Sequence, residues 1–337
     1  MPADRPSPTS PWTGLATSLL SLVLSLAVAE GIVRLADGGA FAQLRAFAAD
    51  AHDGVVMVEG AYAVRRPDGR HTTVTLGPHG LRRTPPSDGP TWLLLGDSQA
   101  LGLGVADDEA MAAVATARGP VRVLPVAVPG YGVGDALRRA GSLLDALHPD
   151  GVLLLVNQAN DWDEAGRPVE TRYEVGGGWL LPRSAPAWAR SFFATPLSGS
   201  HLLHHAVVVL AADLEAVPPV WTTDADATAR ATARLAADVQ QFAAAHPGLP
   251  LRVAYLPLDA TTSPERAAAS PYAALLRGPT PDLLAALRTA LPGHAVVDLT
   301  PALGDPSSFL EHDYHLSPEG HGRVAEVLVA ALAEPSP

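Results

Sequence analysis

The chain has 337 residues, a formal net charge of −12, and a composition that is 47% apolar and 17% charged. This composition indicates a folded core, and the acidic balance excludes the basic stripe with which nucleic-acid-binding proteins neutralise phosphates. All 23 basic residues are arginines and there is no cysteine. These absences exclude lysine Schiff-base chemistry, thiol nucleophiles, disulfides and cysteine-based zinc sites.

The N-terminal segment, residues 1–36, is a tail followed by a targeting element. Residues 1–11 are rich in Pro, Ser and Thr and are expected to be disordered, whereas the 18 residues from Trp12 to Ala29 carry no charge. That length is the lower limit for spanning a bilayer. Both a signal peptide, cleaved after Ala29, and an uncleaved anchor fit this pattern. Apolar residues continue to Ala36, which favours an anchor. We expect the rest of the chain to lie on the extracytoplasmic face, although the arginines on both sides of the stretch decide little about orientation.

Residues 37–90 are predicted to form a linker and a small β-rich segment. Ala40 to Asp53 is Ala-rich and is interpreted as helix or linker. Three strand-like stretches follow, at residues 55–58, 61–65 and 71–76. The Pro-rich residues 85–90 then lead into the main domain.

Residues 91–335 alternate apolar runs with amphipathic stretches, which is typical of a parallel sheet with crossover helices. Five strands are predicted, at residues 92–95, 121–128, 151–156, 251–256 and 295–299. Helices are predicted from Asp107 or Asp108 to Ala117, then from after the turn at residues 129–132 to before Pro149, and over residues 201–217, 224–245, 281–291 and from Ser317 onward. Residues 162–200 show no clear period and are interpreted as an inserted cap or loop region. The expected fold is a three-layer α/β/α sandwich of the flavodoxin-like kind.

Polar residues follow the first three predicted strands and occupy one late loop. They are Ser98, Gly130, Asn160 and the pair Asp313 and His315. In a parallel sheet, strand ends converge on one edge, so these residues can meet. A serine hydroxyl needs a histidine to take its proton, and that histidine needs a carboxylate to fix its tautomer. A glycine N–H and an Asn amide can stabilise an oxyanion, so the set fits acyl transfer.

This combination resembles the SGNH (GDSL-type) hydrolase superfamily over roughly residues 71–333. Gly96-Asp97-Ser98 matches the first sequence block of that family, Gly130 the second, Asn160-Asp161 the third, and residues 315–321 the last. The resemblance implies that Ser98 is the nucleophile and His315 the base. It also implies an oxyanion hole formed by Ser98, Gly130 and Asn160. Residues 75–82, TLGPHGLR, resemble a segment that often precedes the nucleophile in membrane-anchored bacterial members.

Two positions depart from the family pattern. Gln158 stands where the third block usually has glycine, and His312 stands where the last block usually has aspartate. We predict that Asp313, two residues before His315, orients this histidine in place of Glu311 or His312. The same Asp-x-His spacing occurs in relatives that O-acetylate alginate, which adds weight to a transferase.

The function favoured by the sequence is an extracytoplasmic serine esterase that forms an acyl-serine at Ser98. One alternative is an O-acyltransferase acting on an envelope polysaccharide with the same residues, and another is an inactive scaffold. The expected partners are an acyl ester or acylated glycan substrate and the membrane, with no nucleic acid; the sequence identifies no protein partner.

Neither a cofactor nor a metal is expected. His201, His204 and His205 share a helical face, but no acidic or cysteine residue lies among them, so a surface or interface helix is the preferred interpretation. The acidic residues Asp161, Asp163 and Glu164 are interpreted as a solvated loop.

Overall fold

The computed structural model describes residues 11–66, 69–211, 219–270, 272–273, 276, 280–311 and 313–333. Two predictions fall partly outside these residues: the disordered tail, up to residue 10, and the end of the helix predicted to reach Val217.

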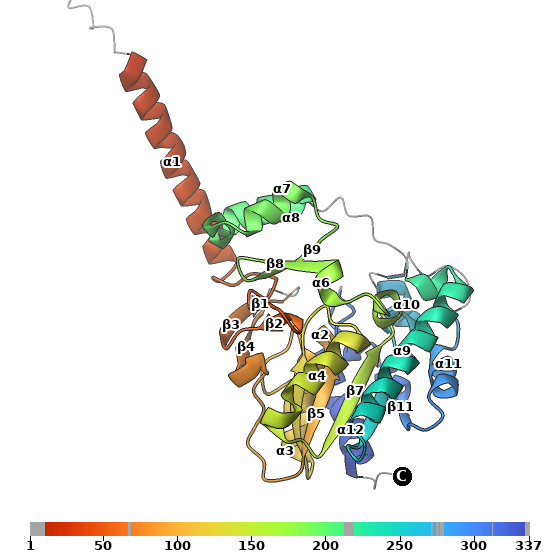
Figure 1. Ribbon diagram of the computed structural model, residues 1–337. Coiled ribbons are helices and arrows are strands. Elements are labelled where there is room, and N and C mark those ends of the chain that lie inside the picture. Colours follow the sequence, from red (N-terminus) through yellow and green to blue (C-terminus); the bar gives the residue numbers. More distant parts are fainter. Residues whose placement is uncertain are drawn as a thin grey trace, which may run out of the picture.

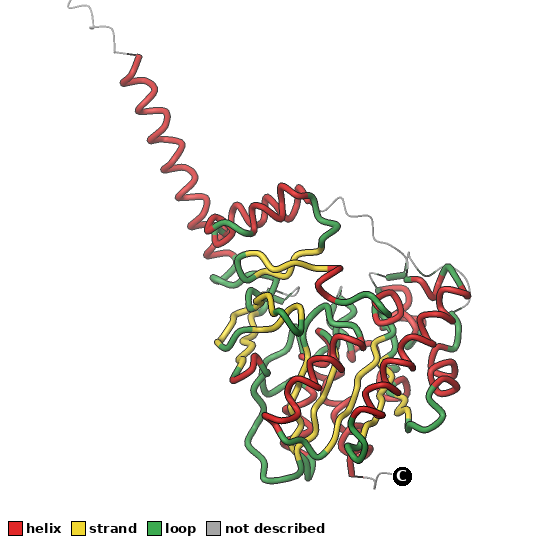
Figure 2. The backbone as a smooth tube through the Cα atoms, in the orientation of Figure 1, coloured by secondary structure: helices red, strands yellow, loops and turns green. Residues whose placement is uncertain are grey.

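The centre of the molecule is a five-stranded, fully parallel sheet with the strand order β11-β10-β7-β5-β6 (Figure 1). Its strands are β5 (Thr91–Gly96), β6 (Arg122–Ala127), β7 (Gly151–Asn157), β10 (Leu251–Leu256) and β11 (Val296–Asp298). Every residue of β7 is buried, because helices cover both faces of the sheet (Figure 2). The predicted strands and fold class are therefore confirmed.

Helices pack in pairs on the sheet. α4 (Val133–Leu147) contacts α9 (Ala225–Ala245), which also contacts α11 (Leu283–Ala290), while α3 (Met111–Arg118) packs against α12 (Pro318–Ala333). Asp224 caps α9 through the Ala227 N–H. The predicted capping of α3 by Asp107 or Asp108 is wrong. Asp107 instead accepts hydrogen bonds from the buried Arg82 and from Thr75 N–H, and α3 begins later.

Two antiparallel hairpins precede the sheet. β1 (Phe47–Asp50) pairs with β2 (Gly54–Met57), and β3 (Gly60–Arg65) pairs with β4 (His71–Leu76). The strand-like stretches were thus predicted correctly, but the helical interpretation of the Ala-rich residues before them is wrong at β1. There, pairing with β2 and burial of Phe47 in the core outweigh the helix propensity of alanine.

Residues 161–211 form an ordered insertion between the third and fourth strands of the sheet. It contains α5 (Asp161–Glu164), α6 (Val169–Arg172), the hairpin of β8 (Tyr173–Gly176) and β9 (Trp179–Pro182), α7 (Ala187–Phe193) and α8 (His201–Ala211). The remaining short helices are α2 (Ser98–Leu101), α10 (Pro264–Ala269) and 3-10 turns at Pro78–Gly80, Pro196–Gly199, Val220–Thr222, Asp259–Thr261, Thr300–Leu303 and Pro306–Ser308.

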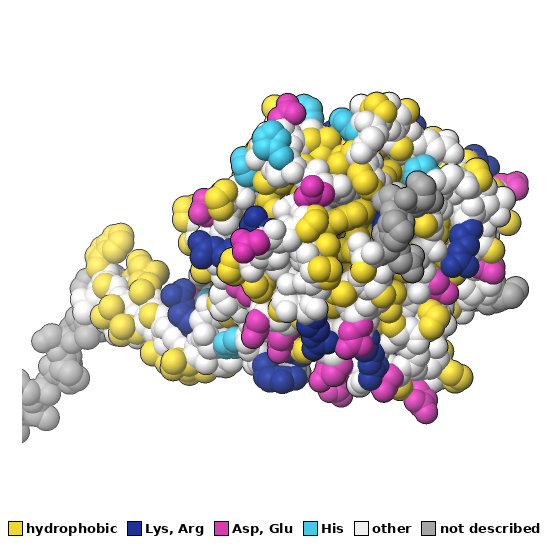
Figure 3. All heavy atoms as spheres, turned by 90° about the horizontal axis from the view of Figure 1, so that it is seen from below, with side chains coloured by type: hydrophobic (Ala, Val, Ile, Leu, Met, Phe, Trp, Pro, Cys, Tyr) yellow, Lys and Arg dark blue, Asp and Glu magenta, His cyan; other side chains and the backbone are white. Residues whose placement is uncertain are grey.

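Helix α1 (Pro11–Ala36) projects from the body of the molecule. Within the described residues it is the one helix long and apolar enough to cross a membrane, with a mean hydropathy of 2.0. Figure 3 shows apolar side chains along its length, in contrast to the charged side chains scattered over the body. Only its C-terminal end approaches another helix, α8.

Candidate active site

Three strand ends bring the predicted site residues to one edge of the sheet. Gly96 at the end of β5 pairs with Ala127 at the end of β6, and β7 lies on the other side of β5. The loops after these strands carry Ser98, Gly130 and Asn160. This edge is where parallel sheets place their ligands.

Ser98 is the first residue of α2, a single turn held at both ends. The Asp97 carboxylate accepts a hydrogen bond from Gln99 N–H and caps the turn. At the other end, Gly102 adopts a left-handed conformation, and the Arg82 guanidinium donates to the Leu101, Gly102 and Val105 carbonyls. Because the first N–H groups of a helix have no intrahelical acceptor, the Ser98 N–H can donate a hydrogen bond to an anion.

Ser98, His315 and Asp313 form a continuous hydrogen-bonded chain. His315 Nε2 lies 2.9 Å from Ser98 Oγ, and His315 Nδ1 lies 2.8 Å from Asp313 Oδ1. Asp313 also accepts from the His315 backbone N–H at 3.1 Å. An ionised carboxylate on Nδ1 keeps the proton there, so Nε2 is free to accept the serine proton.

The surroundings keep Asp313 ionised. Burial raises the pKa of this carboxyl, but the hydrogen bonds and charge of His315 outweigh it, and the net shift is downward. The predicted pairing of Asp313 with His315 thus has the geometry of a catalytic dyad. Of the two neighbours considered, His312 lies outside the described residues, and no hydrogen bond between Glu311 and the His315 ring occurs among the described contacts.

Gln99, which the sequence analysis overlooked, holds the histidine loop in place. Its side-chain Oε1 accepts from Leu316 N–H at 3.1 Å, and its Nε2 donates to the Tyr314 carbonyl at 3.0 Å. The two bonds flank His315 on either side, so the residue next to the nucleophile sets the position of the base. Its only sequence signal is its adjacency to Ser98.

Arg266 is a second overlooked residue. This buried guanidinium donates to the Asp313 carbonyl at 2.9 Å and is paired with the buried Asp259 at 2.6 Å. The Asp259 carboxylate also accepts from Ser270 Oγ. No sequence motif around Arg266 predicts this role, because the Asp313 carbonyl that it binds lies 47 residues away in the chain.

Gly130 must be glycine in this structure. Its φ of 84° lies in the left-handed region, and a Cβ would come within 3.1 Å of the Leu180 and Tyr173 side chains. The next residue, Tyr131, donates its hydroxyl proton to the Val55 carbonyl of β2. The turn that presents the Gly130 N–H is therefore covered by β8 and β9 and tied to the N-terminal hairpin.

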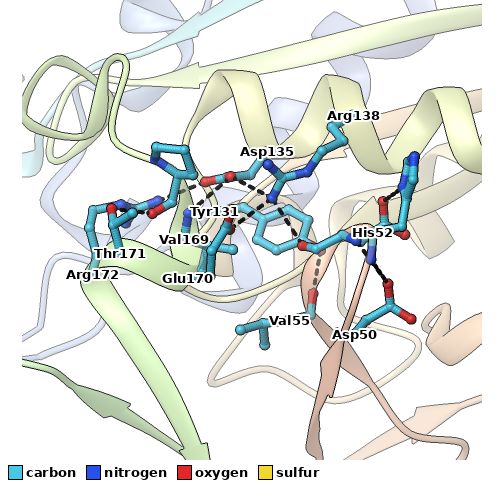
Figure 4. A network of polar contacts seen from close by, with 12 residues as sticks. Asp50, His52, Val55, Tyr131, Asp135, Arg138, Val169, Glu170, Thr171 and Arg172 are labelled. Carbon is cyan, nitrogen blue, oxygen red and sulfur yellow. Dashed lines mark hydrogen bonds and ion pairs between the residues drawn. The ribbon is translucent and has the colours of Figure 1, made fainter.

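A polar network extends this fastening (Figure 4). Arg138 on α4 donates to the Asp53 carbonyl, to Asp135 and to Glu170 of α6, each at 3.1 Å. Arg172 forms a further ion pair with Asp135 at 2.8 Å. The insertion and the first hairpin are thus both fixed to α4, close to the Gly130 turn.

Asn160 lies in the loop after β7 and is oriented by a buried glutamate. Its Nδ2 donates to Glu164 Oε2 at 2.9 Å, which uses one of the two amide protons. Burial raises the pKa of Glu164 to about 8, against the opposing effect of its ion pair with Arg172 at 2.6 Å. No second hydrogen bond from this amide occurs among the described contacts.

The interpretation of residues 161–164 as a solvated loop is wrong. They form α5, in which Asp161 is buried and accepts from Asn157 N–H at 2.6 Å. Burial raises the pKa of Asp161 well above its usual range. No group of three or more His, Asp or Glu side chains able to hold a metal occurs within the described ranges.

Gln158, at the unusual third-block position, has a structural role. Its Oε1 accepts from Tyr255 OH at 2.8 Å, Leu258 N–H at 2.9 Å and Thr261 Oγ1 at 3.1 Å. These bonds join the loop after β7 to the end of β10. The departure from glycine therefore leaves the Asn160 loop ordered.

Two hollows border residues of the candidate site. One of 210 Å³ borders Asp313 and His315 and is otherwise lined by Ala42, Val64, Arg65, Arg66, Leu103 and Gly104. The other, of 420 Å³, adjoins Asn160. Its lining is mainly polar and aromatic side chains of the insertion, including Thr171, Arg172, Tyr173, Arg183 and Ser184, together with Tyr272.

Neither protein-family models nor curated proteins match the chain. Among solved structures, it is similar to a psychrotrophic esterase from Pseudoalteromonas sp. at 11% identity, covering 72% of this chain and 96% of that one, with a TM-score of 0.37. A lipase/acylhydrolase from Enterococcus faecalis (12% identity, 72% and 95% covered, TM-score 0.40) and an acetyl xylan esterase (12%, 72% and 99%, TM-score 0.39) are also similar. With TM-scores below 0.5, none of these likenesses bears on function, which depends on the site itself.

Proposed function

We propose that this chain is a serine esterase of the SGNH (GDSL-type) hydrolase superfamily. The observation that carries the proposal is the hydrogen-bonded chain from Ser98 Oγ through His315 to Asp313, with distances of 2.9 and 2.8 Å. The family blocks in the sequence, in their expected order along a parallel sheet, support the same assignment.

In the first half of the reaction, Ser98 Oγ attacks the ester carbonyl carbon while His315 Nε2 takes the hydroxyl proton. The carbonyl oxygen becomes an oxyanion, for which the Ser98 N–H, the Gly130 N–H and the second Asn160 amide proton are the proposed donors. The bond to the alkoxy oxygen then breaks, and His315 returns the proton to the leaving alcohol. The product is an acyl-serine at Ser98.

In the second half, water attacks the acyl-serine with His315 again acting as base. The acyl–Oγ bond breaks, the carboxylic acid leaves, and Ser98 recovers its proton. Asp313 stays ionised throughout and stabilises the imidazolium that forms in each half. Ser98, His315 and Asp313, together with the proposed oxyanion donors, thus account for both halves of the proposed cycle.

An O-acyltransferase is the second candidate, and the hollow beside Asn160 favours it. Tyrosine rings beside arginine, threonine and serine side chains are a surface suited to sugar hydroxyls, as a glycan acceptor would require. Transfer differs from hydrolysis only in the hydroxyl that attacks the acyl-serine.

The proposed location is the extracytoplasmic face of a membrane, with α1 as an uncleaved anchor. The apolar, exposed helix supports the anchor, whereas the extracytoplasmic face is carried over from the sequence-based expectation. Membrane fractions should then hold full-length protein that carbonate washing does not release. A soluble mature chain beginning at Glu30 would contradict the anchor and indicate a cleaved signal peptide.

Intact-mass analysis after exposure to a fluorophosphonate tests the nucleophile. One covalent adduct is expected on the parent protein, none on Ser98→Ala, and an undiminished adduct on the control Ser191→Ala, whose serine is exposed on α7. If the parent formed no adduct at any pH, the inactive-scaffold alternative would replace the enzyme.

The fate of the acyl group separates the two enzymes. With an activated acetyl ester as donor, an esterase releases acetate at the same rate whether or not soluble oligosaccharides are added. A transferase diverts acetyl groups onto the oligosaccharide, which mass spectrometry detects as a gain of one acetyl per sugar chain.

A further inference from the structure

The α7–α8 region carries an exposed apolar surface outside the candidate active site. We call it the apolar platform and define it by its large exposed side chains: Trp188, Leu197, Leu203, Val208, Val209 and Leu210. Val209 and Leu210 are the most exposed, at 72% and 69%. The opposite face of α8 is buried through His201, His204 and Val207. α8 therefore has a buried side and an apolar C-terminal end, Val208 to Leu210, that is exposed all round.

The buried face is an aromatic cluster. The His204 ring lies 4.7 Å from the Trp179 ring, 4.8 Å from Phe41 and 5.3 Å from Phe193, measured between ring centroids. Burial lowers the pKa of His204 to about 4, so the ring is neutral at pH 7. This packing fixes which side of α8 faces outward.

The C-terminal end of α1 is fastened to the start of α8. Glu30 accepts hydrogen bonds from Ser200 Oγ at 2.7 Å and from His201 and Leu202 N–H at 3.1 and 2.9 Å. Arg34 donates to the Gly199 carbonyl at 3.2 Å. A carboxylate that caps another helix in this way sets the position of that helix relative to its own.

Asp37, just after α1, strengthens the joint. Its carboxylate lies 2.8 Å from His201 Nδ1, 2.7 Å from His205 Nε2 and 3.1 Å from Arg65. Burial raises the pKa of Asp37, but the two histidines outweigh this effect and lower it overall. The start of α8 is thus held at one level along the axis of α1.

That level coincides with the expected surface of a bilayer. The uncharged stretch from Trp12 to Ala29 would be about 27 Å long as a helix, close to the ~30 Å hydrocarbon core. Glu30, the first charged residue after this stretch, would then lie at the interface, and α8 begins against it. In Figure 1, α7 and α8 lie on the side of the body from which α1 projects.

We propose that the apolar platform rests in the surface of the same bilayer that α1 crosses, as a second, interfacial membrane contact. The inference builds on the proposed anchoring by α1. An exposed tryptophan and a group of exposed leucine and valine side chains are suited to an interfacial contact that binds through apolar burial. Seating it there removes from water an apolar surface that a soluble domain would not leave bare.

The β8–β9 hairpin connects this platform to the candidate active site. Trp179 packs under α8, while its neighbour Leu180 points to Gly130, as alternate residues of a strand do. The Gly130 turn is therefore connected to the apolar platform through two adjacent residues, Trp179 and Leu180. The platform would hold the site in one orientation beside the lipid surface.

Because the chain has no cysteine, single cysteines can report membrane depth without other changes. The full chain is reconstituted in phosphatidylcholine vesicles, with an environment-sensitive fluorophore on Val209→Cys, Leu20→Cys or Ala117→Cys, and lipid-borne doxyl quenchers are added. Leu20 lies in α1, and Ala117 is exposed on α3, at the opposite end of the body from α1 in Figure 1.

Quenching of roughly two-fold or more is expected at positions 20 and 209, and none at 117. Quenching at 20 without quenching at 209 would overturn the platform and leave the anchor intact, and would point to a protein partner for this surface. Quenching at neither position would overturn the anchor and the platform together. Fluorophosphonate labelling of the same vesicles reports the enzyme proposal separately.

Discussion

Two aspartate–histidine clusters have nearly the same distances and different surroundings. At the sheet edge, Asp313 lies 2.8 Å from His315, whose far nitrogen meets the hydroxyl of Ser98. At the end of α1, Asp37 lies 2.8 Å from His201 and 2.7 Å from His205, and neither ring has a serine, threonine or tyrosine hydroxyl among its described hydrogen-bond partners.

The difference lies in what the second ring nitrogen can reach. In the first cluster the imidazole stands between a carboxylate and the Ser98 hydroxyl, so it can take up and return the hydroxyl proton. In the second, two imidazoles of α8 and Arg65 of β3 converge on the carboxylate that follows α1, and so join three segments of the chain. Of the two clusters, only the first therefore has the geometry for proton transfer between a histidine and a hydroxyl.

Replacing the two aspartates in parallel should give the largest contrast. Asp313→Asn should lower turnover by roughly 10²- to 10⁴-fold with little change in fold, because His315 loses its tautomer and its counter-charge. Asp37→Asn should leave turnover within about three-fold and lower the unfolding free energy by about 1.5–3 kcal/mol, as charge-assisted hydrogen bonds are lost. Steady-state kinetics with an activated ester and thermal unfolding measure both.

Glu311→Gln serves as a control in the same loop as Asp313 and should cost little activity. If Glu311→Gln abolished turnover and Asp313→Asn preserved it, the orienting carboxylate would be misassigned. If Asp313→Asn, Asp37→Asn and Glu311→Gln all kept the turnover of the parent protein, the activity would not belong to this site.

Two left-handed glycines, one in each region, allow a second contrast. Gly130→Ala should lower turnover about 10- to 100-fold, because the Cβ pushes against Tyr173 and Leu180 and moves the N–H that we propose as an oxyanion donor. Gly39→Ala, at a φ of 76° with open space around it, should cost about 1 kcal/mol of stability and no turnover. Equal kinetic effects in the two variants would show that backbone strain alone, and not the oxyanion turn, is responsible.

A smaller effect is expected at Gln99, a positioning residue. Gln99→Leu removes both bonds that flank His315, and kcat should fall about 10-fold while KM stays near the parent value. The rate of fluorophosphonate labelling should fall in parallel, since it depends on the same base. A loss of stability with an unchanged labelling rate would make Gln99 purely structural.

Acid should lower the unfolding stability of both regions, because each contains a buried neutral histidine. Of the effects predicted here, this one changes turnover least. Burial lowers the pKa of His204 at the platform to about 4 and that of His321 behind the site to about 3. The unfolded rings bind protons below pH 6.5 and the folded rings do not. The contribution of each neutral ring to the unfolding free energy is therefore fully present above pH 6.5. It falls as the pH drops toward 4, by roughly 2 kcal/mol per histidine at pH 5.

His204→Phe should remove one of these two contributions, because phenylalanine keeps the aromatic contacts and does not titrate. Chemical unfolding at pH 7 and pH 5 measures the difference. If this variant lost as much stability on acidification as the parent, protonation of His204 would not contribute.

The sequence by itself determined the architecture and predicted which polar residues meet at one edge of the sheet. Uniform apolar runs such as Leu93 to Leu95 can be satisfied only by burial on both faces, which predicts the parallel sheet, and the sheet in turn predicts that Ser98, Gly130 and Asn160 share an edge. The charge-free stretch after Trp12 likewise predicts its helix. These features follow from local pattern.

Only the tertiary structure decided which polar residues support the site and which support the fold. The Ser98–His315 contact joins residues 217 positions apart, and that between Asp37 and His205 joins residues 168 apart. Whether Glu164 is solvated or buried against Asn160 depends likewise on how α5 packs. Local sequence cannot settle such questions, because the desolvation and partners of a charged group are set by elements from distant parts of the chain.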